Sequence, residues 1–86
     1  MNEFSELKHE YHFDNQDHFI ETPFVKNESD AKKTVIDEGN VQKVYIEYSN
    51  GVKVLVLTEI SNGKVSYYTN YPLKEISNNR FSFVIS

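Results

Sequence analysis

The sequence contains no cysteine and no tryptophan, and it has only three glycines and two prolines among its 86 residues. Without cysteine the chain has no disulfide, no thiolate chemistry and no cysteine-ligated zinc or iron–sulfur site. A glycine-rich loop that cradles phosphate is also excluded, because the glycines are all accounted for by turns or a helix end: Gly39, Gly51 and Gly63. Stability must therefore come from the packing of side chains.

Long apolar runs and an excess of basic residues are also missing. No stretch approaches the roughly 20 apolar residues of a membrane span, and residues 1–6 do not resemble the start of a signal peptide. Nine Lys and Arg stand against 13 Asp and Glu, which gives a net charge of −4. This balance disfavours binding to duplex nucleic acid through phosphate neutralisation. We expect a soluble cytoplasmic protein.

The most legible part of the chain is a run of three strand-like segments that are rich in β-branched and aromatic residues. They cover residues 41–48, 52–60 and 64–71, and Asn50-Gly51 and Asn62-Gly63 separate them. Asn-Gly is typical of type I′ hairpin turns, which need positive φ at both central residues. The segments therefore predict an antiparallel meander.

Two-residue loops at both turns would fix the pairing of these strands. They place Ile46 opposite Leu55, Val44 opposite Leu57, and Leu57 opposite Tyr68. The other face of the sheet then carries Tyr45, Val54, Val56, Tyr67, Thr69 and Tyr71. Neither face alternates regularly to charged residues, so neither is predicted to face bulk water.

Residues 1–28 are poorly defined by pattern. Phe4, Leu7 and Tyr11 recur at helical spacing and predict a short helix over residues 3–11. The alternative is a hairpin that turns at residues 14–17, between Tyr11-His12-Phe13 and Phe19-Ile20. Pro23 would confine a strand over residues 19–25 to a sheet edge.

Residues 29–39 predict a clearer helix. Ser29 is a suitable N-cap, Asp30 would lie at the positive end of the helix dipole, and Gly39 would end the helix. Residues 80–85 predict a last strand. The chain is thus expected to be a single α+β domain over residues 1–86, with one or two short N-terminal helices followed by a four-stranded antiparallel β-meander over residues 41–86.

Two short helices would cover just over half of one face of such a sheet, at about 140 Å² per helix against roughly 500 Å². The uncovered remainder would exceed the apolar surface that monomers usually expose. We therefore expect the second face to meet another protein chain, with a homodimer as one form, through Tyr45, Val54, Val56, Tyr67, Thr69 and Tyr71. An exposed strand edge is a second route to a partner. In the alternative arrangement residues 10–28 and the last strand cover this face within a monomer.

Sites for chemistry are few. His9, His12 and His18 lie within ten residues, and on a helix His9 and His12 would be neighbours that share a divalent ion. Their spacing matches no established ligand pattern, so a minor metal-binding role is an alternative only. No nucleophile elbow or oxyanion loop occurs, and the neighbouring carboxylates Asp37 and Glu38 are expected to be solvated. We expect no catalytic residues and no cofactor.

Two further binding functions remain open on the sequence. Aromatic residues on strands could stack single-stranded RNA, and the candidates are Tyr67, Tyr68, Tyr71, Phe81 and Phe83. Alternatively, an acidic inhibitor of a nucleic-acid enzyme could imitate phosphate through Glu21, Glu28, Asp30, Asp37 and Glu38. Few Lys and Arg frame the aromatics and the net charge is modest, so the predicted function is a small non-catalytic interaction or regulatory protein.

Overall fold

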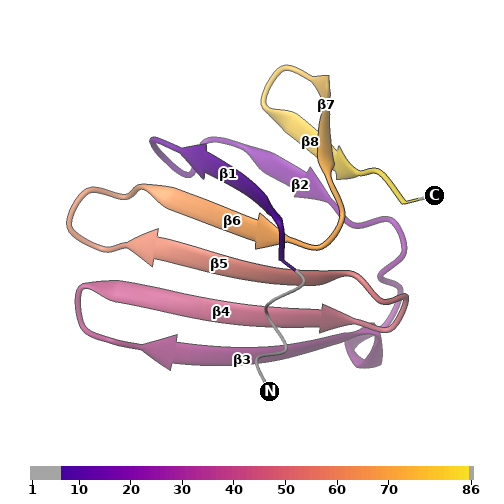
Figure 1. The fold of residues 1–86 in the computed structure, drawn as a ribbon, viewed down its shortest axis with the longest axis horizontal. Coiled ribbons are helices and arrows are strands. Elements are labelled where there is room, and N and C mark those ends of the chain that lie inside the picture. Colours follow the sequence, from indigo (N-terminus) through magenta and orange to yellow (C-terminus); the bar gives the residue numbers. More distant parts are fainter. Residues whose placement is uncertain (1–6, 86) are drawn as a thin grey trace.

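The computed structural model describes residues 7–85, and the fold over this range is built almost entirely from β-strands (Figure 1). The described range has eight strands: β1 (His9–Phe13), β2 (Phe19–Glu21), β3 (Ala31–Asp37), β4 (Val41–Tyr48), β5 (Lys53–Glu59), β6 (Val65–Thr69), β7 (Leu73–Ser77) and β8 (Arg80–Phe83). The helical content of the described range is a single 3₁₀ turn, Glu28–Asp30. The predicted α+β class with N-terminal helices is therefore wrong.

The strands form two sheets. The larger has five strands in the order β1-β6-β5-β4-β3, all antiparallel, and the smaller has three in the order β2-β8-β7. In the smaller sheet β8 pairs antiparallel with β7 and parallel with β2. The predicted meander over residues 41–71 is present as β4, β5 and β6. The predicted fourth strand forms as β8, but it belongs to the other sheet.

The segment predicted to be a helix over residues 29–39 is the edge strand β3. Thr34, Val35 and Ile36 are three consecutive β-branched residues, which lose side-chain freedom in a helix and fit a strand. Gly39 does not end a helix. It takes φ +80° at the first position of a two-residue loop, as a type II′ hairpin turn requires, and Glu38 N–H donates to the Val41 carbonyl at 2.9 Å.

The helix predicted over residues 3–11 falls partly outside the described range, because residues 1–6 are not covered. Residues 9–11 belong to β1, whose side chains alternate between half-buried and exposed. The alternative hairpin is also incorrect in its pairing: both strands exist, but β1 pairs with β6 and β2 pairs with β8.

The first Asn-Gly turn has a three-residue loop in place of the predicted two-residue loop. Tyr48 N–H donates to the Val52 carbonyl at 2.8 Å, and Gly51 has φ +97° whereas Asn50 does not have positive φ. This matches a type I turn closed by a left-handed glycine. The extra residue shifts the register by one, so Ile46 pairs with Val54 and not with Leu55.

A shift of one residue turns every side chain of a strand to the other face. The second hairpin also differs from prediction, because its loop has four residues and Leu57 pairs with Ser66, not Tyr68. The inner face of the larger sheet, which we define as the face toward the smaller sheet, carries Val44, Ile46, Val54, Val56, Val65, Tyr67 and Thr69. The outer face carries Tyr45, Leu55, Leu57 and Tyr68.

The core lies between the two sheets. Within residues 7–85 the buried residues are Val52, Val54, Val65 and Thr69. Val52, Val54 and Thr69 lie at the end of the inner face where β5 begins, whereas Val65 pairs with Thr58 toward the other end. Ile20 and Phe83 of the smaller sheet line a small cavity with Val54 and Tyr67. Within residues 7–85 no helix has the length and apolar character needed to cross a membrane.

Candidate interaction surface

The six predicted interface residues do not share one exposed surface. Val54, Val56, Tyr67 and Thr69 are neighbours on the inner face, because Val54 pairs with Thr69 and Val56 with Tyr67. Val54 is 3% exposed and Thr69 is fully buried, so the chain itself covers this region. Residues 20–24 and β8 provide much of that cover. This resembles the alternative arrangement in which residues 10–28 and the last strand cover the face within a monomer.

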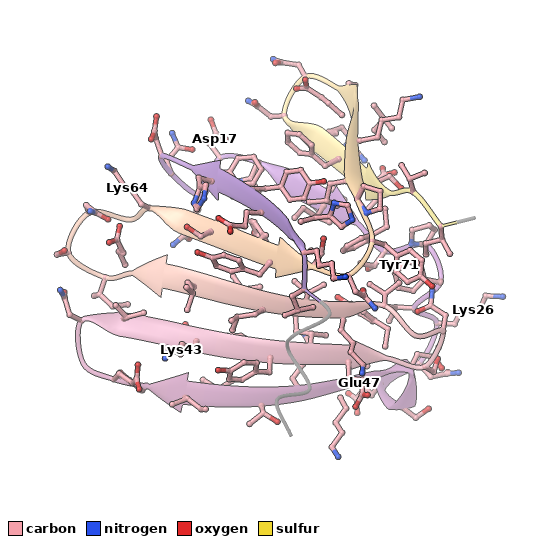
Figure 2. All side chains as sticks on the ribbon, viewed as in Figure 1. Asp17, Lys26, Lys43, Glu47, Lys64 and Tyr71 are labelled. Carbon is pink, nitrogen blue, oxygen red and sulfur yellow. The ribbon has the colours of Figure 1, made fainter. Side chains whose placement is uncertain are left out.

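The remaining two predicted residues lie elsewhere. Tyr45 is on the outer face, opposite Leu55. Tyr71 follows β6, where the chain crosses to the smaller sheet (Figure 2), and its carbonyl accepts a hydrogen bond from the Thr69 hydroxyl. Tyr45 is separated from the other residues because of the one-residue register shift at the first turn.

An aromatic cluster joins the two sheets. The Phe13 ring stacks on His18 with centroids 4.1 Å apart, and it meets Tyr67 and Phe81 edge-on at 5.5 and 5.2 Å. His18 Nε2 and the Tyr67 hydroxyl share a hydrogen bond of 2.7 Å. Edge-on and offset contacts of this kind stabilise beyond the area that they bury. The aromatic cluster, defined by Phe13, His18, Tyr67 and Phe81, therefore has a structural role.

The ionisation of this cluster is shifted by its surroundings. Burial lowers the pKa of His18, while the nearby Asn15 backbone and the Asp17 carboxylate act less strongly in the opposite direction. The Asn15 backbone lies near the ring, but among residues 7–85 no group meets the buried His18 Nδ1 in hydrogen-bond geometry. Burial also raises the pKa of Tyr67, so its hydroxyl stays protonated at neutral pH.

Acid is therefore expected to weaken the fold through His18. The unfolded chain takes up a proton at the ordinary histidine pKa of about 6.5, whereas folded His18 resists protonation until lower pH. The contribution of neutral His18 to the free energy of unfolding is complete above the unfolded pKa. It is lost as the pH falls from the unfolded pKa through the lower folded pKa. Urea unfolding from pH 7.5 to pH 5 checks this: His18→Gln should show a smaller fall in the free energy of unfolding than the wild type, and equal falls would contradict it.

The three histidines do not form a metal site. On the strand β1, His9 and His12 lie three residues apart and point to opposite faces, and His18 belongs to the aromatic cluster. His12 contacts Ser66 and Glu10 on the outer face. Among residues 7–85 no group of three histidine or acidic side chains is placed to hold an ion. The expected neighbourhood of His9 and His12 required a helix that does not form.

The other two binding surfaces are also dispersed. Tyr67 and Tyr68 point to opposite faces of the larger sheet, while Phe81 and Phe83 pack inward against Phe13 and Phe24. Several of the carboxylates proposed to imitate phosphate have partners within the chain. Glu21 pairs with Arg80 and Glu38 with Lys43, and the Asp30 carboxylate accepts hydrogen bonds from the Lys26 and Asn27 backbone, which lower the pKa of Asp30.

The surface that the sequence did not reveal is the outer edge of β3. β3 lies at one edge of the larger sheet and pairs with β4 on one side only (Figure 1). Val35 is 58% exposed and Ile36 is 39% exposed. The β-branched run at residues 34–36 was the available signal for a strand here, but the capping pattern of residues 29–39 favoured a helix.

The hydrogen-bonding pattern shows which backbone groups of β3 point outward. Ser49 N–H donates to the Asp30 carbonyl and Glu38 N–H donates to the Val41 carbonyl, so positions 30 and 38 bond toward β4. Bonded and non-bonded positions alternate along an antiparallel strand. The backbone N–H and C=O groups of Lys32, Thr34 and Ile36 therefore also point toward β4. The N–H and C=O groups that face away from the sheet belong to Ala31, Lys33, Val35 and Asp37.

β1 forms the other edge of the larger sheet, and it is less available. Its inner side chains contact the smaller sheet: the Tyr11 hydroxyl accepts a hydrogen bond from Leu73 N–H at 2.8 Å, and Phe13 contacts Phe81. β1 has five residues against seven in β3. Comparisons of the chain with protein-family models, curated proteins and solved structures found no match.

Proposed function

We propose that the chain is a non-catalytic cytoplasmic binding domain that extends its five-stranded sheet with a strand from another polypeptide. The observation that supports this proposal is the edge of β3, whose outward backbone groups have no partner strand within residues 7–85. Such an edge offers a ready row of donors and acceptors for strand addition. Affinity would come from main-chain hydrogen bonds, and selectivity from the side chains beside them.

The length and composition of β3 support this use. Seven residues at a rise of about 3.4 Å span roughly 24 Å, which is longer than the short edge strands that proteins use to prevent pairing. Its centre is uncharged and carries exposed Val35 and Ile36. Lys32 and Lys33 at one end and Asp37 at the other confine the apolar part, so nonspecific pairing with hydrophobic strands is discouraged.

Proline substitutions at adjacent positions separate binding from folding. Val35→Pro removes an N–H that points away from the sheet, whereas Thr34→Pro removes one that bonds to β4. We expect Val35→Pro to stay folded with a small loss of stability and to lose strand binding. Thr34→Pro should lose about 1–3 kcal/mol of the free energy of unfolding, because it orphans a ladder carbonyl. Chemical denaturation of the two variants measures this difference.

Binding can be tested with peptides selected from a random decapeptide library on the immobilised chain. Fluorescence anisotropy should show peptides that bind the wild type and lose at least about tenfold in affinity for Val35→Pro. In NMR spectra the largest shifts should fall on the amides of Lys33 and Val35. Tyr45→Glu on the outer face is the control and should bind normally. Peptides that bind Val35→Pro unchanged, or a failure to select any, would contradict the proposal.

A further inference from the structure

We infer that the strand which β3 accepts is β3 of a second copy of this chain, paired antiparallel about a twofold axis at Val35. This inference rests on the proposed function, since it names the partner of the same edge. The resulting dimer would join two five-stranded sheets into one continuous sheet. Its interface would be isologous, with each edge presenting the same residues to its copy.

The charges along β3 are self-complementary in this arrangement. The segment reads Lys32-Lys33-Thr34-Val35-Ile36-Asp37-Glu38. When Val35 lies opposite Val35 of the second copy, both lysines face carboxylates: Lys33 faces Asp37 and Lys32 faces Glu38, each twice by symmetry. Thr34 faces Ile36 between them. Opposite charges directly across a sheet stabilise pairing, and like charges oppose it.

The hydrogen bonds permit this register. Val35, Lys33 and Asp37 carry the outward N–H and C=O groups, so Val35 with Val35 and Lys33 with Asp37 become the hydrogen-bonded pairs of the new ladder. Thr34 with Ile36 and Lys32 with Glu38 become the closer, non-bonded pairs. Sliding one copy by a single residue would set outward groups against residues that bond to their own β4, and this is incompatible with a ladder.

Alternative pairings lose the charge match. Sliding by two residues toward the start of β3 sets Lys33 opposite Val35 and Lys32 opposite Ile36. Sliding by two the other way sets Asp37 opposite Val35 and Glu38 opposite Thr34. A parallel, in-register arrangement stacks lysine on lysine and carboxylate on carboxylate. The charges that discourage nonspecific pairing therefore select one orientation and one register.

The side chains concerned are accessible. Residues 32–38 are all exposed along the edge, and Val35 and Ile36 are among the exposed large apolar residues of the described chain. Glu38 already contacts Lys43 of its own chain at 3.0 Å on the outer side. A lysine from the second copy would add to this pair. Pairing would bury the apolar centre of the edge between two rows of opposite charge.

Charge exchange tests the inference on the intact chain. Sedimentation velocity at low salt and several concentrations should show a wild-type dimer that dissociates on dilution. Lys32→Glu with Lys33→Glu should weaken dimerisation at least about tenfold by setting like charges opposite each other, and so should Asp37→Lys with Glu38→Lys. An equimolar mixture of these two variants should restore a dimer, because every charged pair is again complementary. Lys64→Glu with Lys74→Glu is the control: it lowers the net charge as much as Lys32→Glu with Lys33→Glu does, but away from β3, and it should leave dimerisation intact.

A wild type that stays monomeric at the highest concentration would overturn the inference, as would a mixture that fails to associate while both variants retain the wild-type circular dichroism spectrum. If a charge variant does not fold, Val35→Pro replaces it, and a dimer that persists in Val35→Pro also overturns the inference. A monomeric wild type that still binds selected peptides in a Val35-dependent way refutes the homodimer alone. A wild type that neither dimerises nor binds selected peptides refutes the proposed function as well.

Discussion

Val54→Asp is expected to unfold the chain at room temperature. Val54 is 3% exposed, pairs with Ile46 and Thr69, and lies under Ile20 and Phe83 of the smaller sheet. None of the described residues that line the cavity beside Val54 is cationic, and burying an unpaired charge costs several kcal/mol. A domain of this size has a free energy of unfolding of only about 4–13 kcal/mol. Circular dichroism and one-dimensional NMR should show loss of the folded signal.

The adjacent residue provides the control. Leu55 points to the outer face, opposite Tyr45 and Tyr68, and is only half-buried. Leu55→Asp should leave the chain folded, with a loss of about 1 kcal/mol from reduced apolar contact. The reverse result, in which Leu55→Asp unfolds the chain and Val54→Asp does not, would mean that the two faces of β5 are exchanged.

Phe13→Ala is expected to lower the free energy of unfolding by about 3 kcal/mol, toward the lower end for loss of a packed phenylalanine. Phe13 connects β1 to both His18 and Phe81 in the aromatic cluster. Its loss should loosen the smaller sheet from the larger one. Urea denaturation measures the stability change, and amide exchange should be faster in β1 and β8 than in β4 and β5.

Phe19→Ala is the matched control for this variant. Phe19 is 54% exposed, and the Arg80 guanidinium lies 5.2 Å from the centroid of its ring. An exposed cation–π contact contributes at most about 1 kcal/mol. A loss at Phe19 as large as that at Phe13 would argue against the aromatic cluster as the link between the sheets.

The strands of the meander were predictable because three local signals agree. Residues 41–48 and 53–59 combine β-branched and aromatic residues with a flanking Asn-Gly turn, and the structure has β4 and β5 there. The last strand was predictable from a different signal, because Phe81 and Phe83 alternate with the polar residues Arg80 and Ser82. Its sheet was not, because the loop before it does not fix which strand it joins.

The errors have two physical sources. Residues 29–39 carry capping residues of a helix around a β-branched centre, and pairing with β4 decided between these conflicting preferences. In the turns, Gly51 supplies positive φ equally well to a two-residue and a three-residue loop. The sequence therefore locates the turn but leaves its length open, and that single residue decides on which face Tyr45 lies.

Both errors, the helix over residues 29–39 and the length of the first turn, affected the prediction of the interaction surface. A face was predicted where the chain covers itself at Val54 and Thr69. The sequence predicts an exposed strand edge only in general terms and does not place it at β3, because residues 29–39 are predicted to form a helix. The self-complementary order of charges in residues 32–38 is visible in the sequence, but it acquires meaning only once the segment is known to be an unpaired antiparallel edge.

The parallel pairing of β2 with β8 also bears on synthesis of the chain. Phe19 pairs with Arg80, so the middle strand of the smaller sheet is synthesised after both of its neighbours, β2 and β7. Until then β2 and β7 both lack their hydrogen-bonding neighbour, while β3 to β6 can already pair locally. Distant pairings form slowly because a long loop must close first. We therefore expect the smaller sheet to close onto the inner face late in folding, after the local hairpins among β3, β4, β5 and β6 have formed.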